Sequence, residues 1–133
     1  MTQRTLISIV DDDESVRESL AELLEQLGFA VQAFASADEF LRSPAVGETN
    51  CLILDMMMPR MTGAELYDEL LRRKVSIPVI FTTAHAQEKI KPLIQHLEHY
   101  ECLFKPYSYT ALRAAIHSAL RDAPGGSPFG AAG

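Results

Sequence analysis

Residues 5–28 read TLISIVDDDESVRESLAELLEQLG, and this stretch decides the fold. The apolar run at 5–10 has the composition of a strand that is buried on both faces, and three aspartates follow it directly. Apolar side chains then recur at the spacing of a single helix face, and Gly28 supplies a C-terminal stop. A strand therefore leads straight into an amphipathic helix. The apolar face of that helix comprises Val16, Leu20, Leu23, Leu24 and Leu27.

The strand-then-helix pattern repeats along the rest of the chain. Ser36 with Glu39, and Thr62 with Glu65, match the capping box that marks a helix start, and Ser108 can cap a last helix. Strict alternation predicts a parallel sheet with helices on both faces, because short crossovers are right-handed. We therefore expect an α/β fold, a flavodoxin-like doubly wound (βα)5 three-layer sandwich. The five predicted strands span residues 5–10, 29–34, 50–54, 77–82 and 101–104.

Polar residues follow four of the five predicted strands. The first strand ends in the aspartates 11–13, the third in Asp55, the fourth in Thr83 and the fifth in Lys105. Open parallel sheets bind ligands at the carboxyl ends of their strands. A strand order of 2-1-3-4-5 makes these four ends contiguous and leaves the second strand, which carries Gln32, at the edge. The sequence thus predicts one cleft that collects the polar groups.

The composition is that of one ordinary globular domain. The chain has 133 residues, of which 47% are hydrophobic and 23% charged, close to the globular average. A net charge of -6 without a basic stripe argues against direct binding to nucleic acid or to a membrane surface. We expect a domain at residues 1–121, followed at 122–133 by a flexible tail or truncated linker rich in Gly, Pro, Ser and Ala.

Two features of the sequence bear on the cellular compartment. No apolar run approaches the roughly 18 residues of a membrane span, and the first run is too short for a signal peptide. The cysteines, Cys51 and Cys102, lie in apolar runs, which indicates reduced core thiols. We expect a cytoplasmic protein.

Three aspartates are expected to crowd the cleft. Placing Asp11, Asp12 and Asp55 within about 4 to 6 Å of one another would raise at least one pKa unless a cation neutralises them. Mg²⁺ suits this position best, because it takes oxygen ligands and is commonly held by one or two carboxylates plus a substrate phosphate; Mn²⁺ could substitute. A carboxylate beside that metal and a lysine can attack a phosphoryl group. The predicted chemistry is phosphorylation of an aspartate.

Four motifs, taken in order, resemble those of one family. They are Val10-Asp-Asp-Asp-Glu14, Asp55-Met-Met-Met-Pro-Arg-Met-Thr-Gly63, Phe81-Thr-Thr-Ala-His85 and Lys105-Pro-Tyr107. Residues 5–121 are similar to the receiver domain of two-component response regulators, in the CheY-like superfamily. The sequence of the predicted helix at residues 15–20 resembles that of the branch that contains the nitrogen-fixation regulator FixJ.

The resemblance implies a role for each acidic residue. Asp55 would accept the phosphoryl group. Asp12, Asp55 and the main-chain carbonyl of Met57 would bind Mg²⁺, and Asp11 would hold the ion through water. A receiver of this kind is not an enzyme in the usual sense, since it catalyses only its own phosphorylation and dephosphorylation.

The resemblance also implies roles at the ends of the fourth and fifth strands. Lys105 would pair with the phosphoryl oxygens, and a cis bond to Pro106, as in the family, would aim it into the cleft. Thr83 would hydrogen-bond the phosphate and so report its arrival. Thr82 points to the opposite face of its strand and is the less favoured switch.

The partners follow from the same resemblance. The donor would be a sensor histidine kinase or a histidine phosphotransfer protein that docks near Val16, Arg17 and Leu20. Phosphorylation would remodel the face formed by the fourth helix, fifth strand and fifth helix, with homodimerisation or release of an effector domain as the readout.

Two positions depart from the family pattern. An aromatic residue usually stands three places before the lysine, and here that place is Cys102, with Tyr100 on the same strand face. The Gly-Ala pair common before the fifth strand is replaced by residues 98–99, Glu-His. Both departures concern how the signal leaves the domain rather than the chemistry at Asp55.

Two other functions stay open. Asp11-x-Asp13 after a strand also resembles the first motif of haloacid-dehalogenase-type phosphatases, in which Asp11 would be the nucleophile. Thr83 and Lys105 would then bind phosphate, but those enzymes need a further acidic pair on a later strand, and none follows Lys105. The second alternative is a phosphorylation-independent interaction module that keeps the fold, which would account for Cys102 and for residues 98–99.

Overall fold

A computed structural model of the protein describes residues 4–85, 87–97 and 100–121. Strands and helices alternate as predicted, and one short 3-10 helix that the sequence pattern did not predict precedes the third strand. The strands are β1 (Leu6–Val10), β2 (Ala30–Phe34), β3 (Cys51–Asp55), β4 (Val79–Thr83) and β5 (Tyr100–Phe104). The helices are α1 (Glu14–Gln26), α2 (Ala37–Leu41), η1 (Pro44–Gly47), α3 (Gly63–Arg72), α4 (Gln87–Ile94) and α5 (Tyr109–Arg121).

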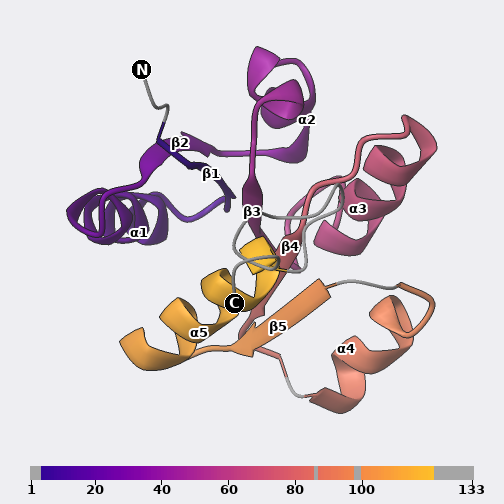
Figure 1. Cartoon of the computed structure of the whole chain (residues 1–133). Helices are drawn as coiled ribbons and strands as arrows, with labels where there is room; N and C mark the ends of the chain where they lie inside the picture. The colour runs from indigo at the N-terminus through magenta and orange to yellow at the C-terminus, as the bar shows by residue number, and fades with distance from the viewer. Residues whose placement is uncertain (1–3, 86, 98–99, 122–133) are drawn as a thin grey trace.

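The five strands form one parallel sheet in the order β2-β1-β3-β4-β5, which confirms the predicted topology. Helices α1 and α5 cover one face of the sheet, and α2, α3 and α4 cover the other (Figure 1). Each face buries its own apolar core. The α2–α4 core includes Phe40, Leu54, Leu66, Phe81 and Ile90. The α1–α5 core includes Ile9, Leu24, Ile53, Ile80 and Ile116.

The burial of each strand follows its place in the sheet. β3 and β4 are buried over their whole length, as their nearly continuous apolar sequences predict for central strands. β2 is half exposed and carries the exposed Gln32, which confirms it as an edge strand. The other edge strand, β5, is also only partly buried.

The predicted helix boundaries are set by local hydrogen bonds. Thr62 and Glu65 form a complete capping box at the start of α3, and the Ser108 hydroxyl accepts the Ala111 N–H at the start of α5. At α2, Ser36 caps the helix by accepting the N–H of residue 39, but the return bond that would complete the box is not made within the described part of the chain. Gly28 ends α1 with a φ of 98°, a conformation that side chains larger than glycine rarely adopt.

The third and fourth strands end one residue later than the sequence pattern indicates. Asp55 is the last residue of β3 and Thr83 the last of β4. The start of β4 also shifts, because Pro78 has no N–H to donate; its carbonyl still accepts the Leu52 N–H at 2.9 Å. Asp55 and Thr83 are therefore anchored by the sheet itself rather than by a loop.

Two predictions lie outside the described residues. They are the flexible tail at 122–133 and the structural effect of the Glu-His pair at 98–99. Within the described ranges, no helix combines the length and the apolar character needed to cross a bilayer.

Candidate functional site

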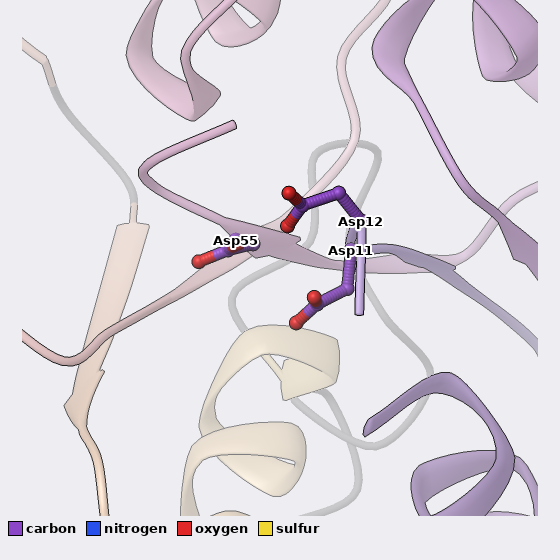
Figure 2. Close-up of side chains that lie close together, drawn as sticks. All are labelled: Asp11, Asp12 and Asp55. Atoms are coloured by element: carbon purple, nitrogen blue, oxygen red, sulfur yellow. The ribbon is translucent and has the colours of Figure 1, made fainter. Parts of the chain in front are cut away.

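Three carboxylates meet at the carboxyl ends of the central strands β1 and β3. Asp11 and Asp12 follow β1 directly, and Asp55 ends β3. One oxygen from each of the three side chains lies within 4.8 Å of the others, and Figure 2 shows the side chains gathered at this edge. Asp11 and Asp55 are buried at 2% and 7% exposure, whereas Asp12 is exposed. The predicted convergence of the acidic residues is confirmed.

The acidic loop after β1 is tightly held. The Asp11 N–H donates to the Phe34 carbonyl of β2 at 3.1 Å, and one Asp11 carboxylate oxygen accepts the Asp13 N–H at 2.9 Å. The Asp13 carboxylate in turn caps α1, accepting the N–H groups of Ser15 and Val16. The acidic loop is thus fixed between the sheet and the start of α1.

Lys105 enters the same site from the end of β5. Its Nζ lies 3.5 Å from Asp11 Oδ2 and 3.9 Å from Asp55 Oδ1. Its main-chain N–H donates to the Thr83 carbonyl at 2.7 Å. The Lys105–Pro106 bond is cis, as the resemblance to the receiver family implies. The ammonium group therefore faces the acidic cluster.

The electrostatics single out Asp55. Burial raises its pKa from 3.8 to about 7, and the neighbouring charge of Asp11 adds to the rise. Lys105 and a hydrogen bond from the Met57 main-chain N–H act in the opposite direction, while Asp12 contributes a smaller increase. Without a bound cation, Asp55 is poised between its acid and carboxylate forms near neutral pH.

The loop between β3 and α3 runs past the acidic cluster and carries Met57. The Met57 side chain is 43% exposed, and its main-chain N–H binds Asp55. Arg60 has a φ of 73°, and the Met61 N–H donates across it to the Pro59 carbonyl at 2.8 Å, which forms a γ-turn. A non-glycine residue in this conformation stores strain, and such turns cluster at functional sites.

Gly63 closes this loop against the site. A Cβ at position 63 would lie 2.6 Å from the Asp55 carbonyl oxygen and 3.0 Å from Met56 Cα, both main-chain atoms. The Gly63 N–H donates to the Met56 carbonyl at 2.8 Å. The close approach of two backbone segments therefore requires glycine here.

The two threonines at the end of β4 have different surroundings. Thr83 is fully buried, lies on the same strand face as Phe81 in the α2–α4 core, and accepts the His85 N–H on its hydroxyl at 3.0 Å. Thr82 is also buried and is the register partner of Asp55 in β3. The structure thus places Thr83 and Thr82 on opposite faces of β4, as strand alternation predicts.

The sequence interpretation missed Phe104. It is the register partner of Thr83 in the β4–β5 ladder and is 38% exposed. Cys102 is the register partner of Phe81 two residues earlier in the same ladder, and the ring of Tyr100 packs on Phe81 with centroids 5.8 Å apart. Phe104 stands directly before Lys105 in the sequence, but its pairing with Thr83 follows from the β4–β5 register, which the sequence pattern does not define.

An apolar groove of about 380 Å³ opens beside the acidic loop, between α1 and the start of α5. Tyr107 lines it, and burial together with the charges of Asp11 and Asp55 raises the pKa of this phenol. Tyr107 thus lines the groove and lies near the acidic cluster. The groove is lined by Ser15, Val16, Ser19, Leu20, Leu23, Tyr107, Tyr109 and Leu112.

The donor set fits a hard divalent cation. Three carboxylates within 4.8 Å offer oxygen ligands only, and the raised pKa of Asp55 marks a negative charge that lacks compensation. The methionines nearby do not offer a soft-metal site, because Met56 and Met58 are buried in the α2–α4 core. Chemically, the arrangement pairs a buried carboxylate with an ammonium group and with oxygen donors that could hold a divalent cation.

Comparison with known proteins gives one consistent family. A family model described as the response regulator receiver domain matches residues 7–117. The transcriptional regulatory protein FixJ of Azorhizobium caulinodans is 35% identical over 120 residues, covering 90% of this chain and 57% of the relative. The response regulator protein TmoT of Ectopseudomonas mendocina is 34% identical over 122 residues, covering 92% of this chain and 56% of the relative. The chain thus spans little more than half the length of these curated relatives.

Solved structures agree with the sequence relatives. The crystal structure of FixJ-N superposes with a TM-score of 0.80 at 35% identity, covering 91% of this chain and 97% of that one. A low-resolution structure of the response regulator StyR gives a TM-score of 0.77 at 36% identity, covering 90% of this chain and 60% of that one.

Proposed function

The chain belongs to the family of response regulator receiver domains, and from this premise we propose that Asp55 accepts a phosphoryl group in a Mg²⁺-dependent reaction. The observation that carries the proposal is the convergence of Asp11, Asp12, Asp55 and Lys105 on one point at the carboxyl ends of the strands. Asp55 is the buried member of the cluster that ends a central strand, which suits the role of acceptor.

We assign the metal ligands within this cluster. Asp12, Asp55 and the main-chain carbonyl of Met57 would bind Mg²⁺, and Asp11 would act through a water molecule. The exposure of Asp12 leaves its side of the site open to the hydrated ion, which Mg²⁺ requires because it keeps several waters. Bound there, the ion would stabilise the ionised form of Asp55 and the charge on the transferring phosphoryl oxygens. Mn²⁺, which takes the same oxygen ligands, could replace it.

The remaining residues would serve the transfer itself. In its ionised form, one Asp55 carboxylate oxygen forms a bond to phosphorus while the bond from phosphorus to the donor's imidazole nitrogen breaks; that nitrogen then takes up a proton. Lys105, now 3.9 Å from Asp55, would pair with the equatorial phosphoryl oxygens. Thr83 would exchange its bond with the His85 N–H for one to the phosphoryl group.

We propose that the donor is a phosphohistidine on a sensor kinase or a phosphotransfer protein, and that it docks in the groove beside α1. The groove is mostly apolar, with serine and tyrosine side chains in its lining, and Tyr107, one of these, lies near the acidic cluster. The sequence prediction placed docking near Val16, Arg17 and Leu20, and two of these, Val16 and Leu20, line the groove. A helix that carries a phosphohistidine would lie there within reach of Asp55.

The output would be a change at the α4–β5–α5 face. Phosphorylation adds charge at Asp55, draws Thr83 towards it and so disturbs the β4–β5 ladder in which Thr83 is paired. Homodimerisation on this face, or release of a further domain, would read out that change. We also propose that the domain works in the cytoplasm, where its thiols stay reduced; Cys51 and Cys102 are both free and unbridged.

Labelling with acetyl phosphate tests the proposed function. In the presence of Mg²⁺, the wild type should gain one acid-stable, base-labile phosphoryl group, and Asp55→Asn should gain none. Asp38→Asn, which removes an exposed carboxylate on α2, is the matched control and should label like the wild type. Absence of label on the wild type would favour the phosphorylation-independent module.

The same experiment separates the phosphatase alternative. A haloacid-dehalogenase-type enzyme would use Asp11 as nucleophile, so Asp11→Asn would abolish turnover of acetyl phosphate while Asp55→Asn would retain it. The receiver assignment predicts instead that Asp55→Asn abolishes labelling by acetyl phosphate. It also predicts that the domain turns over only its own phosphoryl group.

The docking assignment has a separate test. Ser19→Arg places a bulky charge in the groove, whereas Gln26→Arg places the same side chain on an exposed part of α1 outside it. Ser19→Arg should lose transfer from a phosphohistidine donor and keep labelling by acetyl phosphate. Equal transfer to both variants would contradict the docking surface.

A further inference from the structure

Arg17 reaches from α1 to the main chain of the acidic loop. Its Nη1 donates a hydrogen bond of 2.7 Å to the Asp11 carbonyl oxygen, and the Arg17 side chain is half buried there. Hydrogen bonds between a charged donor and a neutral acceptor are stronger than those between neutral groups. The guanidinium group is therefore a firm link between the helix and the loop.

This bond completes the set of partners around Asp11. The Asp11 N–H donates to the Phe34 carbonyl, Oδ1 accepts the Asp13 N–H, and Oδ2 lies 3.5 Å from the Lys105 ammonium. The carbonyl oxygen is the remaining polar atom, and Arg17 binds it. Each polar atom of this buried residue thus has a defined partner, which fixes the loop from both ends.

Arg17 achieves this without occupying the carboxylates. No ion pair within 4.0 Å joins Arg17 to Asp11, Asp12 or Asp55, all of which the structure describes. A cation that bound those oxygens directly would compete with a metal ion for them. By binding a main-chain carbonyl instead, Arg17 orders the loop and adds no further cation at the carboxylate oxygens.

We propose that Arg17 is a positioning residue for the divalent-cation site: it holds the Asp11 carbonyl, and thereby orients the Asp12 carboxylate one residue later. The inference rests on the proposed function, since it assumes that Asp12 is a metal ligand. Groups that hold the ligands of a metal in place commonly change metal affinity by about 10 to 100-fold when they are removed. A pure charge effect has the opposite sign, because removing a nearby positive charge would strengthen cation binding.

Mg²⁺ titration followed by tyrosine fluorescence tests this role; the chain has four tyrosines and no tryptophan, and Tyr107 lies near the site. Arg17→Met removes the donor and the charge but keeps an apolar stem. We expect it to raise the Kd for Mg²⁺ about tenfold. Arg17→Lys keeps a charged N–H donor and should recover most of the affinity. Arg42→Met, which removes an exposed arginine at the C-terminal end of α2, should bind Mg²⁺ like the wild type.

The thermal unfolding of the metal-free protein distinguishes positioning from a loss of folding. Arg17→Met should unfold near the wild-type temperature without Mg²⁺ and should show a smaller rise in Tm when Mg²⁺ is added. Equal or tighter Mg²⁺ binding by Arg17→Met would overturn the inference, as would failure of Arg17→Lys to recover affinity. Asp12→Ala checks the premise: if it binds Mg²⁺ as the wild type does, the proposed metal site itself is wrong.

Discussion

Thr83 and Phe104 are register partners in the β4–β5 ladder, with the threonine fully buried and the phenylalanine 38% exposed. Their side chains lie on the same face of the sheet, because partners in parallel strands share a face. The half-exposed ring is thus the immediate neighbour of the hydroxyl that we assign to sensing the phosphate. A shift of Thr83 towards Asp55 would move the threonine away from the Phe104 ring and change how the ring packs.

Phe104→Ala should therefore uncouple the switch from the chemistry. We expect normal labelling of Asp55, because the ring does not belong to the acidic cluster, and a loss of the conformational response on β5. The rate at which a thiol reagent modifies Cys102, on the same strand face, measures that response with and without acetyl phosphate. Burial raises the pKa of Cys51 to about 12, so this second thiol should stay unreactive.

Leu71→Ala provides the control for Phe104→Ala, since Leu71 is also an exposed apolar residue, at 50%, but lies on α3. The control should keep the phosphorylation-dependent change at Cys102. If Phe104→Ala keeps that change as well, Phe104 takes no part in the switch.

Thr83→Val and Thr82→Val form a matched pair. Both remove a hydroxyl from a fully buried threonine and nearly preserve its shape. Thr83→Val should label at Asp55 yet lose the change at Cys102, because the hydroxyl that would turn from the His85 N–H to the phosphoryl group is gone. Thr82→Val should retain the change. The reverse pattern would move the switch to Thr82, the register partner of Asp55.

The fold and the acidic cluster were predictable because their signals are local. Alternating strand and helix segments in the sequence predict a parallel sheet. The positions of polar residues at strand ends then predict which side chains come together at one edge of the sheet. Arg17 and Phe104 show what was not predictable. The bond from the Arg17 guanidinium to a carbonyl six residues earlier depends on the angle at which α1 leaves the loop. The pairing of Phe104 with Thr83 depends on a strand register that periodicity alone does not define.

The raised pKa of Asp55 makes the metal-free domain sensitive to pH. Between the ordinary pKa of 3.8 and the folded value of about 7, the folded state holds a proton that the unfolded state has lost. The free energy of unfolding should therefore fall as pH rises through this window. Asp55→Asn lacks this contribution and should be more stable than the wild type at pH 8 by about 1 to 3 kcal/mol, a range reduced for solvent screening.

Urea unfolding at pH 4 and pH 8 in the presence of a chelator measures the difference between wild type and Asp55→Asn. The difference should be near zero at the acidic pH. Between pH 4 and pH 8, Lys105→Met should lose more stability than the wild type, since Lys105 lowers the pKa of Asp55. Saturating Mg²⁺ should raise the stability of the wild type at pH 8 but leave that of Asp55→Asn little changed. A difference that does not vary with pH would contradict the raised pKa.

Gly63→Ala should disturb the site through the backbone. The new Cβ would lie 2.6 Å from the Asp55 carbonyl oxygen, so the loop that carries Met57 must move. Overpacking of this kind costs about 1 to 3 kcal/mol of the free energy of unfolding, and we expect weaker Mg²⁺ binding as well, because the Met57 carbonyl is a proposed ligand. Gly47→Ala is the control: apart from the adjacent backbone, no atom lies within 4 Å of a Cβ there, and a stabilisation of up to about 1 kcal/mol is expected from the stiffer unfolded chain. Urea midpoints and Mg²⁺ titrations that rank the two alanine variants equally would show that the close approach at Gly63 does not position the metal site.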